Sequence, residues 1–356
     1  MRQIRVLVVE DSLMFRELLV RNLNLDPAIE VVAAVRNPFE AREAIIKYQP
    51  DVMTLDIEMP KMNGIDFLKM LMPQQPMPVI VISSLSDKVF DALNAGAVDF
   101  VAKPANATRE QLETFMRNDL PVKIKVASIA RLGSRKRAPA GSTVPPLSRT
   151  TAQSESPMQI ASKGRSDLVL AIGASTGGTE AIASVLKEFD TDIPGTVIVQ
   201  HMPAGFTDMF AKRLNDQCRV RVKEAQNGDL VVPGQVLIAP GGDAHMRLVK
   251  VNGVYQVTVR QGERVSGHCP SVDVLFQSVA DVAGKNAIGV ILTGMGADGS
   301  KGMLAMRNAG ARTIGQDEST CVVYGMPKVA FQIGAVEYQE KLPDIAKRVY
   351  TTLGTM

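Results

Sequence analysis

The segment Leu168-Val-Leu-Ala-Ile-Gly-Ala-Ser-Thr-Gly-Gly178 is the most informative part of the second half of this 356-residue chain. Its first five residues are apolar and predict a buried strand. Three glycines around Ser175 and Thr176 predict a tight turn, and residues 179–188 predict a helix. In α/β folds a strand, a sharp turn and a helix either present a nucleophile or bind a phosphate. The rest of the sequence must decide between these alternatives.

The length of the chain predicts two domains, and its hydrophobic fraction of 46% is typical of globular proteins. No apolar run reaches the roughly 20 residues that a membrane span requires. The first residues lead directly into a predicted strand, so we expect no signal peptide and no membrane insertion. The three cysteines are widely spaced and form no metal-binding pattern. We therefore expect a cytoplasmic protein with reduced cysteines.

A basic, low-complexity segment separates the two predicted domains. Seven basic residues and one acidic residue lie between Val126 and Arg165, a net charge of +6 within a total of +3. Residues rich in Ser, Thr, Pro and Ala cannot bury a core. No aromatic side chains are interleaved for base stacking, so we expect a solvated tether and no nucleic-acid partner. The predicted boundaries are 1–122 for the first domain, 123–165 for a flexible basic linker and 166–356 for the second domain.

The first domain alternates strands with helices. Apolar runs predict five strands, at residues 4–9, 30–35, 51–55, 79–82 and 99–102. Helical segments lie between them, and the pattern Thr108-x-x-Gln111 predicts a capping box for a further helix. Five strands that alternate with helices predict a doubly wound parallel sheet, covered on both faces.

Polar residues follow these strands at their carboxyl ends, where open α/β sheets bind ligands. They are Glu10 and Asp11, Asp56, Ser83 and Lys103. Converging carboxylates need a cation, and oxygen ligands of this kind suit Mg²⁺. A hydroxyl at Ser83 and an ammonium at Lys103 would complete a site for an anionic group on Asp56. This set of residues predicts the formation of an aspartyl phosphate.

Residues 1 to about 120 resemble the flavodoxin-like receiver domains of two-component systems. The resemblance lies in Glu10-Asp11, Leu55-Asp-Ile-Glu-Met-Pro60, Ser83, Phe100 at the aromatic switch position and Lys103-Pro104. It implies that Asp56 accepts phosphate from a histidine kinase, with Glu10, Asp11 and Asp56 as Mg²⁺ ligands and Ser83, Phe100 and Lys103 as switch residues. Glu10 departs from the pattern, since many receivers have Asp there.

The second domain repeats the α/β pattern and adds a hairpin. Strands are predicted at residues 168–172, 196–200, 236–239, 287–292 and 311–314. Two further strands, at 245–249 and 255–259, are joined across Asn252-Gly253, a strong hairpin signal. We therefore predict a second, larger doubly wound α/β domain with a β-hairpin.

Three reactive residues follow strands of the second domain: Ser175, His201 and Asp298. A serine nucleophile needs a base, and the base needs an orienting carboxylate. The chain has three histidines, so His245 and His268 stay as alternative bases. A dinucleotide site is disfavoured because G-x-G-x-x-G is absent. The pattern Gly-x-Ser-x-Gly matches a nucleophile elbow, but the order Ser, His, Asp differs from that of α/β-hydrolases.

Residues from about 167 to 350 resemble the catalytic domain of CheB methylesterases, which act in chemotaxis. The matching motifs are Gly173-Ala-Ser-Thr-Gly-Gly-Thr-Glu180, Gln200-His-Met-Pro203, His268-Cys-Pro-Ser-Val-Asp-Val-Leu-Phe276 and Leu292-Thr-Gly-Met-Gly-Ala-Asp-Gly299.

This resemblance implies Ser175 as nucleophile, His201 as base and Asp298 as its orienting group. It also implies Met295 as an oxyanion donor and Thr176 as a residue that lines the site. The implied reaction is cofactor-free hydrolysis of glutamate methyl esters on chemoreceptors and deamidation of selected glutamines.

The two domains together predict a phosphorylation-controlled hydrolase, whose unphosphorylated receiver covers the catalytic face. Two other classes of protein are alternatives. A pure signalling module would bind partners through the second domain without using Ser175 chemically. A nucleic-acid-binding response regulator would need a DNA-binding motif after the receiver, and no helix-turn-helix pattern follows it.

Overall fold

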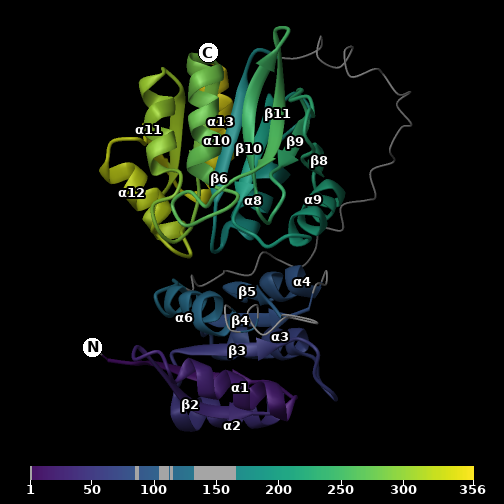
Figure 1. The fold of residues 1–356 in the computed structure, drawn as a ribbon, viewed down its shortest axis with the longest axis vertical. Coiled ribbons are helices and arrows are strands. Elements are labelled where there is room, and N and C mark those ends of the chain that lie inside the picture. Colours follow the sequence, from purple (N-terminus) through teal and green to yellow (C-terminus); the bar gives the residue numbers. More distant parts are fainter. Residues whose placement is uncertain (1, 85–87, 104–111, 113–114, 132–165) are drawn as a thin grey trace.

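Two parallel sheets, each flanked by helices, form the two ends of the molecule (Figure 1). The computed structural model describes residues 2–84, 88–103, 112, 115–131 and 166–356. Pro104, the capping box at 108–111 and residues 132–165 of the expected linker lie outside the described residues. The predicted class, two doubly wound α/β domains, is confirmed.

The first sheet has the strand order β2-β1-β3-β4-β5, and all its neighbours are parallel. The strands are β1 (Ile4–Val9), β2 (Ile29–Val35), β3 (Val52–Asp56), β4 (Val79–Ser83) and β5 (Asp99–Ala102). The helices are α1 (Leu13–Leu23), α2 (Pro38–Tyr48), α3 (Gly64–Gln74), α4 (Lys88–Asn94), the π-helix η1 (Phe115–Asp119) and α6 (Leu120–Ser128).

Local sequence signals place the helix starts in this domain. The side chain of Ser12 accepts a hydrogen bond from the amide of Phe15 and caps α1, as its position predicts. Asn37 caps α2 in the same way, with Pro38 in the first turn. The apolar residues of β3 and β4 are fully buried, which is typical of central parallel strands.

Helix α6 crosses the boundary that the sequence predicted at residue 122. The helix runs on to Ser128 and buries Leu120, Ile124 and Ala127 against the first sheet. Residues 123–128, at the start of the expected linker, are therefore helical. The domain boundaries themselves stay a prediction.

The second sheet has seven parallel strands in the order β14-β13-β12-β6-β7-β9-β8. The strands are β6 (Val169–Ala174), β7 (Gly195–Gln200), β8 (Arg221–Glu224), β9 (Gln235–Ile238), β12 (Ala287–Ile291), β13 (Arg312–Gln316) and β14 (Tyr338–Glu340). The helices are α8 (Gly178–Lys187), α9 (Phe206–Gln217), α10 (Val272–Val282), α11 (Ser300–Asn308), α12 (Met326–Gln332) and α13 (Leu342–Leu353), with 3₁₀ turns η2 (Gly284–Asn286) and η3 (Glu318–Thr320).

The sequence did not predict the two edge strands of this sheet, β8 and β14. Both are short and contain mostly polar residues, so they lack the apolar run that marks the buried strands. The hairpin was predicted correctly as β10 (Ala244–Val251) and β11 (Val254–Gln261). Its turn residues Asn252 and Gly253 both have positive φ, which a type I′ turn requires.

In Figure 1, α4 and β5 of the first domain lie near α9 of the second. Aromatic side chains join the two domains there. Phe90 stacks on Phe210 with 5.7 Å between ring centroids, and Phe100 packs against Phe206 at 4.7 Å. Because all four rings are buried, this contact is continuous with the core of both domains. Across the described ranges, no helix combines the length and the apolar character needed to cross a membrane.

Candidate active site and phosphoacceptor site

Three neighbouring strands of the second sheet bring the predicted reactive residues together. Ser175 directly follows β6, His201 directly follows β7, and Asp298 lies in the loop between β12 and α11. The chain passes from β6 to β7 on one side and returns to β12 on the other. The site therefore lies at the topological switch point of the sheet, where ligands bind in open α/β folds.

The turn after β6 is held from both sides. The amide of Ser175 donates to the carbonyl of Thr293 at 3.0 Å, and the side-chain amide of Gln200 donates to the carbonyl of Ser175 at 3.0 Å. Gly177 has a φ of +78°, and a Cβ there would lie 2.7 Å from the side chain of Val322. Glycine is required at this position both for its backbone conformation and for space.

His201 and Asp298 form a hydrogen-bonded pair. Nε2 of His201 lies 2.8 Å from Oδ2 of Asp298, and the side chains are 9% and 0% exposed. An ionised carboxylate only accepts hydrogen bonds, so Nε2 carries the proton and Nδ1 is left with its lone pair. Nδ1 is buried and has no hydrogen-bond partner within the described ranges. A buried nitrogen without a hydrogen-bond partner is available to accept a proton from a nearby donor.

The start of α10 holds Asp298 in place. Oδ1 accepts from the hydroxyl of Ser271 at 2.7 Å and from the amide of Asp273 at 3.0 Å, and Oδ2 accepts from the amide of Val272 at 2.7 Å. Burial raises the pKa of Asp298, but hydrogen bonding and charge from His201, with the Asp273 and Ser271 donors, outweigh it and leave that pKa below its ordinary value. The carboxylate is therefore ionised and orients the imidazole.

The backbones next to Ser175 and His201 lie close together, because the amide of His201 donates to the carbonyl of Ala174 at 3.2 Å. No hydrogen bond joins the Ser175 hydroxyl to the imidazole in the described part of the chain. Contacts between nucleophile and base are often long without substrate. The residues predicted as a triad therefore lie in one site, with the pair His201–Asp298 already formed.

Gly294, in the turn after β12, lies directly against Ser175. A Cβ on Gly294 would lie 2.7 Å from the Cβ of Ser175, so only glycine allows this approach. The next residue, Met295, is 43% exposed, and its amide donates to no other described residue. The Thr293 hydroxyl donates to the carbonyl of Thr176 and accepts from the amide of Val323, which fixes the turn. An unpaired amide beside a serine suits an oxyanion.

The two other histidines occupy different positions. His245 is buried, with Nδ1 accepting from the amide of Ser271 at 3.2 Å and Nε2 lying 2.8 Å from the carbonyl of Glu263. His268 stacks on His201 with 3.7 Å between centroids and an angle of 11° between planes. Among the three histidines, the contact with Asp298 belongs to His201.

Sequence reasoning missed Gln200 and Ser271 as parts of this site. Gln200 donates to the carbonyls of both Ser175 and His201. Ser271 caps α10 and donates to Asp298. A capping serine before an apolar run is a signal that could have predicted the helix start, but nothing local in the sequence links it to Asp298, 27 residues away.

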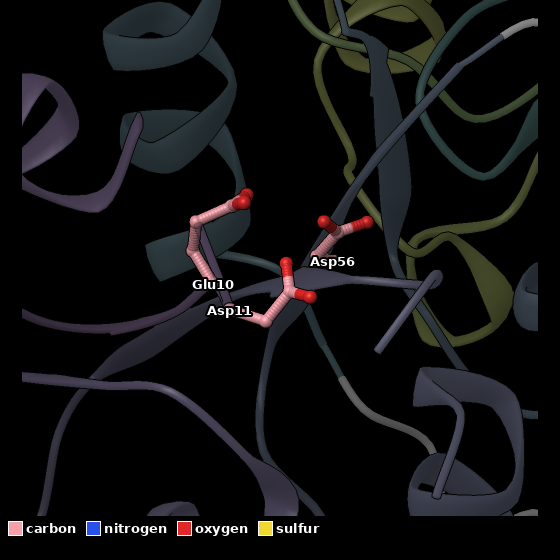
Figure 2. A group of neighbouring side chains, drawn as sticks. All are labelled: Glu10, Asp11 and Asp56. Carbon is pink, nitrogen blue, oxygen red and sulfur yellow. The ribbon is translucent and has the colours of Figure 1, made fainter. Parts of the chain in front are cut away.

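A second polar site lies at the ends of β1 and β3, the switch point of the first sheet. Figure 2 shows the carboxylates of Glu10, Asp11 and Asp56 gathered there, and one oxygen of each lies within 4.8 Å of the others. Nζ of Lys103 lies 3.0 Å from both oxygens of Glu10 and 2.9 Å from Oδ2 of Asp56. The three carboxylates suit a hard divalent cation, which prefers carboxylate oxygens.

Burial and charge repulsion act on this second site. Burial, with the nearby charge of Asp56, raises the pKa of Glu10 to about 7, although Lys103 opposes the shift. The hydroxyl of Ser83, at the end of β4, is buried and has no hydrogen-bond partner in the described part of the chain. A cation would favour the charged form of Glu10, and an anionic group on Asp56 would accept a hydrogen bond from Ser83.

Thr176, beside the predicted nucleophile, contacts the other domain. Its hydroxyl donates to Oδ2 of Asp99 at 2.9 Å, and Oδ1 of Asp99 lies 2.7 Å from Nζ of Lys123. Asp99 begins β5, and the next residue, Phe100, packs against Phe206 at the start of α9. The receiver strand β5 therefore contacts both the serine turn and the helix that follows His201.

Comparison with known proteins agrees with this geometry. The family described as CheB methylesterase matches residues 170–349, and the response regulator receiver domain matches residues 6–114. The chain belongs to the CheB methylesterase family. It is 58% identical over 356 residues to protein-glutamate methylesterase/protein-glutamine glutaminase 2 of Syntrophomonas wolfei, covering 100% of this chain and 99% of that one.

Other CheB relatives give the same result. The protein-glutamate methylesterase/protein-glutamine glutaminase of Syntrophotalea carbinolica is 51% identical, with 99% of this chain and 98% of that one covered. The crystal structure of the Thermotoga maritima CheB methylesterase catalytic domain superposes with a TM-score of 0.51 at 36% identity, covering 52% of this chain and 98% of that one. The predicted family of both domains is confirmed.

Proposed function

We propose that this protein is a phosphorylation-regulated esterase that removes methyl groups from glutamate methyl esters on chemoreceptors. The observation that carries the proposal is the buried pair His201–Asp298 beside Ser175, with Nδ1 of His201 unpartnered. Relatives of nearly full length that are named protein-glutamate methylesterase/protein-glutamine glutaminase support the substrate.

In the proposed reaction, Nδ1 of His201 takes the proton of the Ser175 hydroxyl while Oγ attacks the ester carbonyl carbon. The amide of Met295 donates to the oxyanion that forms. Collapse breaks the C–O bond to the methoxy group, and His201 returns the proton so that methanol leaves. Water then attacks the acyl-enzyme with His201 again as base, and glutamate and free Ser175 result.

The same acyl-enzyme forms from a glutamine side chain when ammonia leaves in place of methanol. Only the leaving group differs, so deamidation of selected receptor glutamines needs no further residue. No cofactor takes part in either hydrolysis.

In the receiver we propose Asp56 as the phosphoacceptor, with a histidine kinase as donor. Glu10, Asp11 and Asp56 would hold Mg²⁺, which neutralises charge on the phosphoryl oxygens. Lys103 and the unpartnered hydroxyl of Ser83 would contact the phosphoryl group. The arrangement of the three carboxylates supports this assignment.

Control follows from the contact between the domains. We propose that the unphosphorylated receiver restricts access of a receptor helix to Ser175, with Asp99 on Thr176 and the switch residue Phe100 on Phe206 as the restricting contacts. Phosphorylation would favour an arrangement without these contacts. A protein consisting of residues 166–356 should then release methanol faster than the unphosphorylated full chain, and an equal or lower rate would exclude inhibition by the receiver.

The catalytic proposal is tested by methanol release from methylated receptor membranes with wild-type protein and Ser175→Ala. The variant should lose essentially all activity while its melting temperature stays unchanged. Full activity in Ser175→Ala would refute the serine mechanism and return the second domain to the class of binding modules.

A further inference from the structure

His268 touches the catalytic imidazole without belonging to the triad. The two rings are nearly parallel, 3.7 Å apart between centroids and 11° apart in orientation. This separation is full van der Waals contact. Because the rings lie face to face, His201 cannot turn edge-on about χ2 unless His268 moves away.

A tight turn presents His268 in this position. Val265 and His268 exchange two backbone hydrogen bonds of 2.9 Å each, and Ser266 and Gly267 between them have φ values of +53° and +84°. Positive φ at both central residues defines a type I′ turn. The hydroxyl of Ser266 donates to Oδ2 of Asp273 at 3.1 Å and ties the turn to α10.

The same short segment, residues 265–273, holds the other half of the pair. Its C-terminal part supplies the three hydrogen bonds that Asp298 accepts from α10 and its cap. One end of the segment therefore fixes the plane of the His201 ring, and the other end fixes the carboxylate to which Nε2 donates. Together they hold Nδ1 in one direction.

The charge state of His268 suits this arrangement. Burial lowers the pKa of His268 to about 4, and the nearby His201 adds to this effect. Arg264 and Lys123 also lower the pKa, and Asp298 opposes the shift. The ring is neutral at neutral pH and can face His201 in its cationic form without repulsion. A neutral aromatic face over a cation is favourable.

We propose that His268 is a positioning residue for the esterase reaction: its ring face locks the His201 imidazole with Nδ1 toward Ser175. The inference rests on the proposed function. It requires the planar ring of His268 and does not require its nitrogen atoms. Replacing the ring by a methyl group should therefore slow catalysis, whereas another planar ring should preserve it.

The test compares His268→Ala and His268→Phe in the full-length protein, with a small-molecule phosphodonor and Mg²⁺ present. We expect kcat of His268→Ala to fall about tenfold with KM within about twofold, and kcat of His268→Phe to stay within about threefold of wild type. Glu263→Gln, an exposed change two residues before the turn, is the matched control. A kcat of His268→Ala equal to wild type, or an equal loss in both variants, would overturn the proposal.

Imidazole ¹⁵N spectra provide a readout that folding alone does not change, and the chain has only three histidines to assign. His201 should show a single Nε2–H tautomer in wild type and His268→Phe, and a mixed or exchange-broadened signal in His268→Ala. An unchanged His201 signal in His268→Ala would refute the locking role. If Ser175→Ala is inactive as expected while these variants behave like wild type, the positioning role fails and the proposed function stands.

Discussion

Replacing Asp298 by Asn tests the orientation of the His201 imidazole, which we propose as the base. The wild-type carboxylate accepts four hydrogen bonds, one from His201 and three from Ser271, Val272 and Asp273. An amide has one accepting atom and one donating atom, so it cannot satisfy this set of donors.

Either orientation of the new amide disturbs the site. With its NH₂ group at the Oδ2 position, it opposes the amide of Val272 and forces Nε2 of His201 to accept, which moves the imidazole proton to Nδ1 and removes the base. With its NH₂ group at the Oδ1 position, it opposes the amide of Asp273 and no longer carries the charge that stabilises the imidazolium. The same exchange in serine proteases lowers kcat by about 10⁴.

We therefore expect Asp298→Asn to lower kcat by about 10³ to 10⁴, equivalent to about 4 to 5.5 kcal/mol in the activation barrier. Methanol release from methylated receptor membranes measures this loss. Asp281→Asn is the matched control, because Asp281 lies on the same helix, α10, but is exposed and accepts a hydrogen bond from Gln277 on the surface. A loss of less than tenfold in Asp298→Asn, or an equal loss in Asp281→Asn, would refute the orienting role of Asp298.

The same variant has a pH signature in stability. The folded-state pKa of Asp298 is depressed, so its stabilising contribution is present above the unfolded-state pKa and is lost as pH falls through the folded-state pKa. The difference in melting temperature between wild type and Asp298→Asn should be largest near neutral pH and should shrink in acid. A difference that grows in acid would contradict the sign.

Three further experiments address the serine turn, the metal site and the contact between the domains. Gly294→Ala forces a methyl group to within 2.7 Å of the Ser175 Cβ, so we expect methanol release to fall at least a hundredfold, and wild-type activity would exclude the close approach. Because the pKa of Glu10 is about 7, Mg²⁺ affinity measured by calorimetry should rise about tenfold from pH 6 to pH 8, and a flat profile would contradict a protonated Glu10. Asp99→Ala removes the acceptor of Thr176, so unphosphorylated protein should release methanol faster, and an unchanged rate would show that this contact does not restrict access.

The parallel sheets and the positions of the reactive residues could be predicted from the sequence because both depend on local patterns. Buried parallel strands are continuous apolar runs, and polar residues directly after them meet at one edge of the sheet. The positions of Ser175 and His201 directly after strands follow from this pattern, and Asn252-Gly253 predicts the hairpin.

The support of the site could not be predicted in this way. Ser271 meets Asp298, and His268 meets His201, only because α10 packs beside β6 and β12 in three dimensions. These contacts join residues 27 and 67 positions apart, and no periodicity in the sequence records them. The edge strand β8 could not be predicted because its local signal is weak. A partly exposed strand of four residues has little apolar pattern.

Regulated esterase activity is tested by methanol release from methylated receptor membranes, measured with and without a small-molecule phosphodonor and Mg²⁺ for wild type and Asp56→Ala. We expect the phosphodonor to raise the rate of wild type and to leave the rate of Asp56→Ala unchanged. A wild-type rate that the donor does not change, or an equal rise in Asp56→Ala, would contradict control through Asp56. Absence of methanol release under every condition would contradict the esterase itself.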